Sequence, residues 1–257
     1  MQPPNSGTGH QTEGDNEDPN HPSRGPAGSS GDHEQPLSID RMFLLALVVG
    51  VFGGLGAIVF RSIIALFQNI FFYGNFALSY DPDAHIEPSP FGAFIILVPV
   101  VGAILVTWIT RTLAPEARGH GVPEVLGAIY HRRGHISPVV VLAKSLASAI
   151  SVGTGGSVGR EGPIIQIGSA FGSTLGQLTR IPTRQRITLI GAGAAAGIAA
   201  TFNAPIGGLA FAIELLLVSI SVYTVALVAA ATVTATYIGR LYSGLEPSFD
   251  VPSIAHF

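Results

Sequence analysis

The stretch that decides the fold reads GTGGSVGREGP, from Gly153 to Pro163, and an apolar run follows it directly. Four of its first seven residues are glycine, and the charged pair Arg160 and Glu161 comes next. Such a combination does not suit a helix that faces lipid. Because proline is favoured in the first turn of a helix, where its missing N–H needs no partner, the pattern predicts a loop followed by a helix that begins at about Pro163.

The start of this predicted helix is a candidate anion site. Unpaired backbone N–H groups and the positive end of the helix dipole point at the same place there, and the glycines let the loop turn further N–H groups inward. Gly159, Arg160, Gly162 and Pro163 are the residues we expect to form it. A site made of partial charges suits a permeant anion, since a full cation at low dielectric constant would bind it too tightly.

Glu161 lies at the mouth of the predicted site. A carboxylate inside a membrane is energetically costly and therefore indicates a function. Its carboxylate can occupy the anion position itself, and protonation or displacement by the anion would swing it out. Glu161 is thus the predicted gate; the alternative is that it only pairs with Arg160 to satisfy two buried charges.

A second stretch repeats the pattern of flexible backbone, proline and helix. It consists of Gly119, His120, Gly121, Val122 and Pro123, and two such helix starts can converge on one ion. We therefore expect these five residues to form the other part of the anion site, with His120 as a titratable donor. The alternative is an ordinary turn with a helix cap.

Outside these motifs the composition is typical of an all-α polytopic membrane protein. Only 11% of the 257 residues are charged, and the mean hydropathy is +0.48. Several uncharged runs reach the roughly 20 residues that span a bilayer as a helix. Pro and Gly interrupt them, also at Pro205, which predicts helices broken inside the membrane. The uncharged runs are 42–60, 62–80, 91–110, 145–159, 162–179, 187–213 and 215–239.

Small residues recur at a spacing of four along these runs, which predicts close packing of helix backbones. The pairs and triplets are Gly50 and Gly54, then Gly168, Gly172 and Gly176, then Gly193 and Gly197. Lys144 and Glu214 are single charges near apolar runs, and we expect each to reach an interface or to pair.

Three segments differ in character. Residues 1–40 hold six Gly, six Pro, seven carboxylates and one cation, which predicts a disordered polar tail. Residues 41–243 form the predicted membrane-embedded part, and 244–257 the start of an external linker. Basic linkers at 111–118, 131–133 and 180–186 belong in the cytoplasm by the preference of Lys and Arg for that side, which also places the N-terminus there.

Composition excludes other classes. The absence of cysteine rules out disulfides and thiol chemistry, no cofactor is expected, and no basic face is available for nucleic acid. The GxSxG match at 155–159 leaves an intramembrane serine hydrolase as a distant alternative, and it requires a strand-to-helix elbow. A scaffold whose glycines serve only packing is a further alternative.

The motifs together resemble the CLC family of chloride channels and transporters. Residues 159–163 are similar to its GREGP signature, 119–123 to its GSGIP signature, and 202–208, before Glu214, to its FNAP segment. The resemblance covers residues 42–243. It implies chloride as the transported substrate, Glu161 as the external gate, helix starts at about Pro123 and Pro163 as chloride ligands, and a homodimer in the cell membrane without enzymatic activity.

The resemblance also implies that the chain is one half of an inverted repeat. A second CLC half is expected to complete the pore, so the chain is predicted to be a fragment or a split gene product. Two residues depart from the family pattern: His120 replaces a chloride-binding Ser, and Leu215 replaces the internal glutamate of proton-coupled members. Leu215 favours passive conduction of the voltage-gated channel type, with chloride/proton antiport as the alternative.

Overall fold

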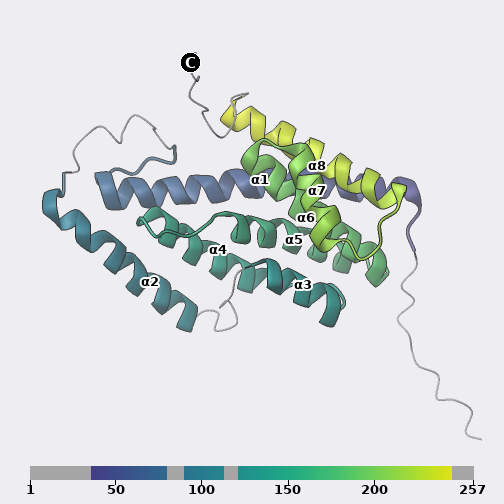
Figure 1. Ribbon diagram of the computed structural model, residues 1–257, viewed down its shortest axis with the longest axis horizontal. Coiled ribbons are helices and arrows are strands. Elements are labelled where there is room, and N and C mark those ends of the chain that lie inside the picture. The colour runs from purple at the N-terminus through teal and green to yellow at the C-terminus, as the bar shows by residue number, and fades with distance from the viewer. Residues whose placement is uncertain (1–35, 80–89, 113–120, 245–257) are drawn as a thin grey trace, which may run out of the picture. The chain divides into compact units, whose positions relative to one another are not determined.

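The computed structural model describes residues 36–79, 90–112 and 121–244, and within these ranges every regular element is a helix. This confirms the predicted all-α class (Figure 1). Most of the predicted tail and linker, together with Gly119 and His120, lie outside the described residues. In chain order the elements are α1 (Ile39–Gln68), the π-helical turn η1 (Asn69–Tyr73), the 3₁₀ helix η3 (Gly92–Leu97), α2 (Val98–Thr112), α3 (Val122–His131), α4 (Pro138–Gly153), α5 (Glu161–Leu178), α6 (Thr183–Phe202), α7 (Pro205–Phe211), the π-helical turn η5 (Ala212–Leu216) and α8 (Val222–Ser243).

Three stretches are long and apolar enough to cross a membrane as helices: Ile39–Tyr73, Gly92–Thr112 and Val222–Tyr242. Two further apolar helices, Pro138–Gly153 and Pro205–Leu216, are shorter than a full span. The breaks fall where Pro and Gly predict them. At one break Asn203 takes a left-handed conformation that ends α6, and α7 begins two residues later at Pro205.

Helix α6 is the centre of the packing, because α1, α5 and α8 all lie directly against it. A Cβ added to Gly168 of α5 would lie 2.0 Å from the carbonyl oxygen of Gly193 in α6, and one added to Gly193 would lie 2.0 Å from that of Gly168. On α1, a Cβ at Gly53 would lie 2.8 Å from the Cβ of Ala196. These contacts confirm the predicted close packing by small residues.

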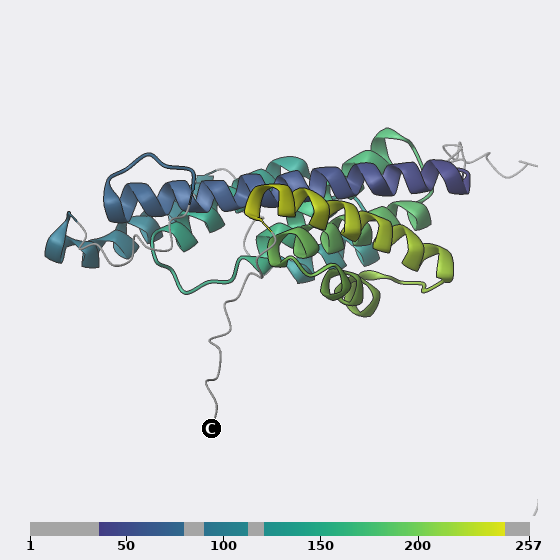
Figure 2. The ribbon, with the colours of Figure 1, turned by 90° about the horizontal axis from the view of Figure 1, so that it is seen from above.

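The directions of the helices follow from contacts near their ends. The backbone N–H of Leu37 donates to Gln185 at the start of α6, and Ser62 and Tyr242 share a hydrogen bond near the ends of α1 and α8, at 3.1 Å in both cases. Helices α1, α6 and α8 therefore run in the same direction, and Figures 1 and 2 show α1 and α8 side by side. Helix α5 runs the opposite way, since Gly176 packs against Arg186 at the start of α6.

This arrangement brings basic residues to one end of the bundle, which we call the basic end. The segment after α3 reaches it as well: Ser173 of α5 donates to the carbonyl of Gly134 at 2.6 Å, and Arg186 Nη1 lies 2.9 Å from His135 Nε2. The arginines of the basic end are Arg41, Arg132, Arg133, Arg180, Arg184 and Arg186.

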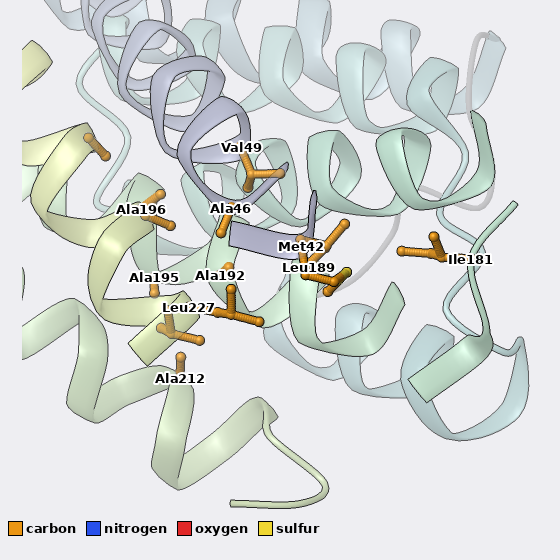
Figure 3. Close-up of a cluster of buried hydrophobic side chains, with 13 residues drawn as sticks. Met42, Ala46, Val49, Ile181, Leu189, Ala192, Ala195, Ala196, Ala212 and Leu227 are labelled. Atoms are coloured by element: carbon orange, nitrogen blue, oxygen red, sulfur yellow. The ribbon is translucent and has the colours of Figure 1, made fainter. Parts of the chain in front are cut away.

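The largest buried cluster fills the space between α1, α6 and α8 near the basic end (Figure 3). Met42, Leu189 and Leu227 are fully buried in it, and most of the other members are alanines, chiefly of α6 and α8. Small side chains let the three backbones approach closely, so the core is thin and the helices are held at short separation.

Candidate anion site

The N-terminal ends of α3 and α5 meet, as the two motifs predicted. Gly121, directly before α3, has a φ of +86°, and a Cβ there would lie 2.7 Å from both Cα and O of Gly162 in α5. Only glycine combines this conformation with so close an approach. The N–H groups of Val122 and Gly162 thus belong to helix starts that converge at one place, where the N–H groups of the first turn have no partner within the helix.

Helix α5 begins at Glu161, two residues earlier than predicted, with Arg160 as its N-cap. The predicted start was two residues late because proline is tolerated throughout the first turn, where none of the N–H groups has a helical partner. The first helical bond runs from the N–H of Ile164 to the carbonyl of Arg160, at 3.4 Å. Glu161 is therefore the first residue of the helix itself and lies at its positive end, where the sequence predicted a gate.

The side chain of Glu161 is exposed and turns back over Gly159. Its Oε2 lies 2.6 Å from the position that a Cβ on Gly159 would occupy. Any other residue at 159 would displace the carboxylate, so Gly159 makes room for Glu161. The sequence predicted Gly159 only as part of the anion cradle.

Arg160 is directed toward another group. Its guanidinium lies over the ring of Phe202, 5.3 Å from the centroid, and it lines a cavity of about 350 Å³ together with Arg61, Gln68 and Thr201. The described part of the chain shows no ion pair between Arg160 and Glu161. The alternative that Glu161 only pairs with Arg160 is therefore not seen among the described residues.

A buried polar network that the sequence did not predict joins α3, α4 and α5 just beyond the helix starts. Lys144 Nζ of α4 lies 2.5 Å from Glu124 Oε1 of α3, and Gln166 Nε2 of α5 donates to Glu124 Oε2. The expectation that Lys144 pairs is confirmed. The one available signal for its partner was the acidic residue in the first turn of α3.

Two other sequence features lie apart from this region. Ser157 is exposed in the loop between α4 and α5, and the described residues include no strand to form the elbow that a serine hydrolase requires. Glu214 and Leu215 are exposed on η5. The hydrolase interpretation therefore lacks its structural basis in the described residues.

A comparison with known protein families covers the residues of both motifs. The family described as voltage gated chloride channel matches residues 102–257. The chain belongs to this family, the CLC proteins. The resemblance found in the sequence is thereby confirmed, and with the apolar helices it makes the chain a multi-pass membrane protein.

Curated CLC relatives include proteins named H(+)/Cl(-) exchange transporter ClcA. The one from Citrobacter koseri is 34% identical over 226 residues, covering 86% of this chain and 46% of the relative. The one from Salmonella arizonae is 32% identical over 226 residues, again covering 86% and 46%. The chain thus spans about half the length of these relatives.

Solved CLC structures show the same relation. A slow cyanobacterial Cl−/H+ antiporter is 27% identical with a TM-score of 0.64, over 80% of this chain and 48% of the other. A CLC-type fluoride/proton antiporter is 25% identical with a TM-score of 0.65, over 85% and 51%. The described helices therefore have the fold of about half a CLC subunit.

Proposed function

We propose that this CLC chain takes part in chloride transport, with the anion held at the N-terminal ends of α3 and α5 and with Glu161 as the gate. The observation that carries the proposal is the contact between Gly121 and Gly162, which joins two helix starts beside a carboxylate. Dipole ends and backbone N–H groups attract an anion without a formal cation. The anion-binding residues in this proposal are Gly119, His120, Gly121, Val122, Pro123, Gly159, Arg160, Gly162 and Pro163.

Within that activity we propose chloride/proton exchange. The relatives named above are exchange transporters and the structural neighbours are antiporters, which favours the alternative over the passive conduction expected from Leu215. A carboxylate gate suits exchange, because one group can bind a proton and compete with chloride for the same place. Because Leu215 stands in place of the internal glutamate of proton-coupled members, protons must reach Glu161 through another group.

A complete transport unit needs more than the described helices. Since the chain spans about half the length of its relatives, we propose that a second CLC half completes the pore, and that the unit is a homodimer in the cell membrane that uses no cofactor. Experiments on transport therefore use the protein as isolated from its native membrane, with any further residues or chains that accompany it.

Glu161→Gln is expected to abolish proton movement while chloride movement continues, because the amide keeps the shape of the side chain but cannot carry a proton or a charge. Chloride efflux and proton uptake are measured together in liposomes. Asp40→Asn, an exposed acid at the start of α1, is the control and is expected to behave as wild type. Coupled proton flux persisting in Glu161→Gln would refute Glu161 as the gate, and the scaffold alternative predicts that result.

The basic end is expected to face the cytoplasm, because Lys and Arg are retained on that side during insertion. The chain has no cysteine, so single cysteines report sidedness without interference. An impermeant maleimide should label Asn75→Cys in intact cells and Thr179→Cys only after permeabilisation; both positions are exposed. The reverse labelling pattern would show the opposite orientation.

A further inference from the structure

A polar cavity lies between α3, α4 and α5 on the side of the basic end. Its volume is about 330 Å³. Gln166 lines it although this side chain is only 4% exposed, and its Oε1 has no hydrogen-bond partner among the described residues. A buried acceptor in a polar cavity of this size is satisfied by water, which finds several partners there. The other polar residues that line the cavity are Glu124, His131, Arg132, His135 and Ser137.

Glu124 forms the boundary between this cavity and the buried interior. Its side chain is 29% exposed, whereas that of its ion-pair partner Lys144 is 8% exposed. Water in the cavity therefore reaches the carboxylate, while Lys144 and Gln166 hold it in a fixed position. The charged or titratable groups around it are Lys144 from α4, His131 and Arg132 from the end of α3, and His135 from the segment before α4; α5 contributes the neutral Gln166.

Glu124 and the proposed gate Glu161 both lie in the first turns of helices whose starts touch each other. Glu124 is the third residue of α3, whose start touches Gly162. Its partner Gln166 follows Glu161 by five residues on α5, which corresponds to about 7.5 Å of helix rise. The cavity reaches Gln166 and is not lined by Glu161, so a proton has to cross this stretch through intervening water.

We propose that Glu124 is the proton relay between this water-filled cavity and Glu161, a role that rests on the exchange activity proposed above. The carboxylate of Glu124 takes one proton from a hydronium ion in the cavity, which leaves water, and then passes it through intervening water to the carboxylate of Glu161, which restores the ionised Glu124. Two other carboxylates are present among the described residues. Asp40 lies at the start of α1, and Glu214 lies on η5 and lines none of the cavities described above.

The relay also gives a physical basis for coupling. When Glu124 is protonated, the charge of Lys144 is no longer balanced, and the excess positive charge lies one turn from the converging helix starts. This favours an anion in the cradle at the moment when a proton is present. Because such coupling is reciprocal, a bound anion also favours protonation of Glu124.

The test is the ratio of proton to chloride flux in liposomes. Glu124→Gln alone would leave Lys144 buried without its ion pair, which is costly, so it is combined with Lys144→Met. The double variant is expected to lose proton flux to background and to keep chloride flux. Glu124→Asp retains a carboxylate beside Lys144 and is expected to keep proton flux. Glu214→Gln is the matched control, with the wild-type ratio expected.

The other outcomes of these flux measurements would overturn the relay or the exchange activity. A wild-type ratio in the double variant overturns the relay, and loss of coupling in Glu214→Gln instead transfers the role to that residue. Loss of both fluxes in the double variant and in Glu124→Asp would assign the network a structural role and overturn the relay as well. Wild-type protein that moves chloride without protons would refute the exchange activity itself, a result distinguishable from failure of the relay alone.

Discussion

Gly168→Ala is expected to destabilise the protein by about 4 kcal/mol or more, a magnitude reserved for disruptions of tight packing. The added Cβ would lie 2.0 Å from the carbonyl oxygen of Gly193 and 2.6 Å from its carbonyl carbon. Both contacted atoms are backbone, so no side chain can move aside to make room. The next contact along the interface is equally tight, since a Cβ at Gly172 would lie 2.1 Å from the carbonyl oxygen of Leu189. The helices α5 and α6 must therefore separate.

Thermal unfolding in detergent, followed by the fluorescence of the single tryptophan, measures this effect. Gly127→Ala is the matched control: it lies inside α3, and an added Cβ meets nothing within 4 Å. Alanine is better than glycine in a helix interior by about 1 kcal/mol, so this variant is expected to unfold at or above the wild-type temperature. Equal unfolding temperatures for the two variants would contradict the backbone contact between α5 and α6.

Gly121→Ala is expected to lower chloride transport and chloride affinity by about tenfold or more, because small displacements of positioning groups have effects of this size. The φ of +86° strains any residue with a Cβ, and the added atom would lie 2.7 Å from the backbone of Gly162. The start of α3 must move away from that of α5. The two sets of N–H groups would then no longer face the same anion.

Chloride efflux from liposomes and calorimetric titration with chloride measure the loss. Gly134→Ala is the control for backbone strain, because Gly134 also has a positive φ of +74° but follows α3 at the basic end. It is expected to lose stability and to keep chloride affinity. An equal loss of affinity in both variants would show that strain, rather than the meeting of the two helix starts, explains the result for Gly121.

Much of the fold could be predicted from local signals. Proline marks the starts of α3 and α7 and lies in the first turn of α5, because its missing N–H is harmless only there. Glycines at a spacing of four predicted close packing of helix backbones, which the structure shows between α5 and α6. Even the meeting of the two helix starts followed from two copies of the same short pattern, Gly121 to Pro123 and Gly159 to Pro163.

The parts that could not be predicted depend on tertiary contacts. Glu124 binds Lys144 and Gln166, which are 20 and 42 residues away, and no periodicity relates these positions. The position of the Glu161 carboxylate over Gly159 depends on a side-chain conformation that the local sequence does not determine. The expectation of passive conduction rested on Leu215 alone, whereas a proton route can be supplied by a residue on a different helix.

The contact between Gly168 and Gly193 also limits how the molecule can move. Carbonyl groups of two helices that touch directly leave no flexible side chains between them to absorb a shift, so α5 and α6 behave as one rigid body. A large rocking of α5 during a transport cycle would have to break this seam. Opening and closing of the proposed gate are therefore expected to involve rotation of the Glu161 side chain and small adjustments of α3. The remaining helices are expected to keep their positions.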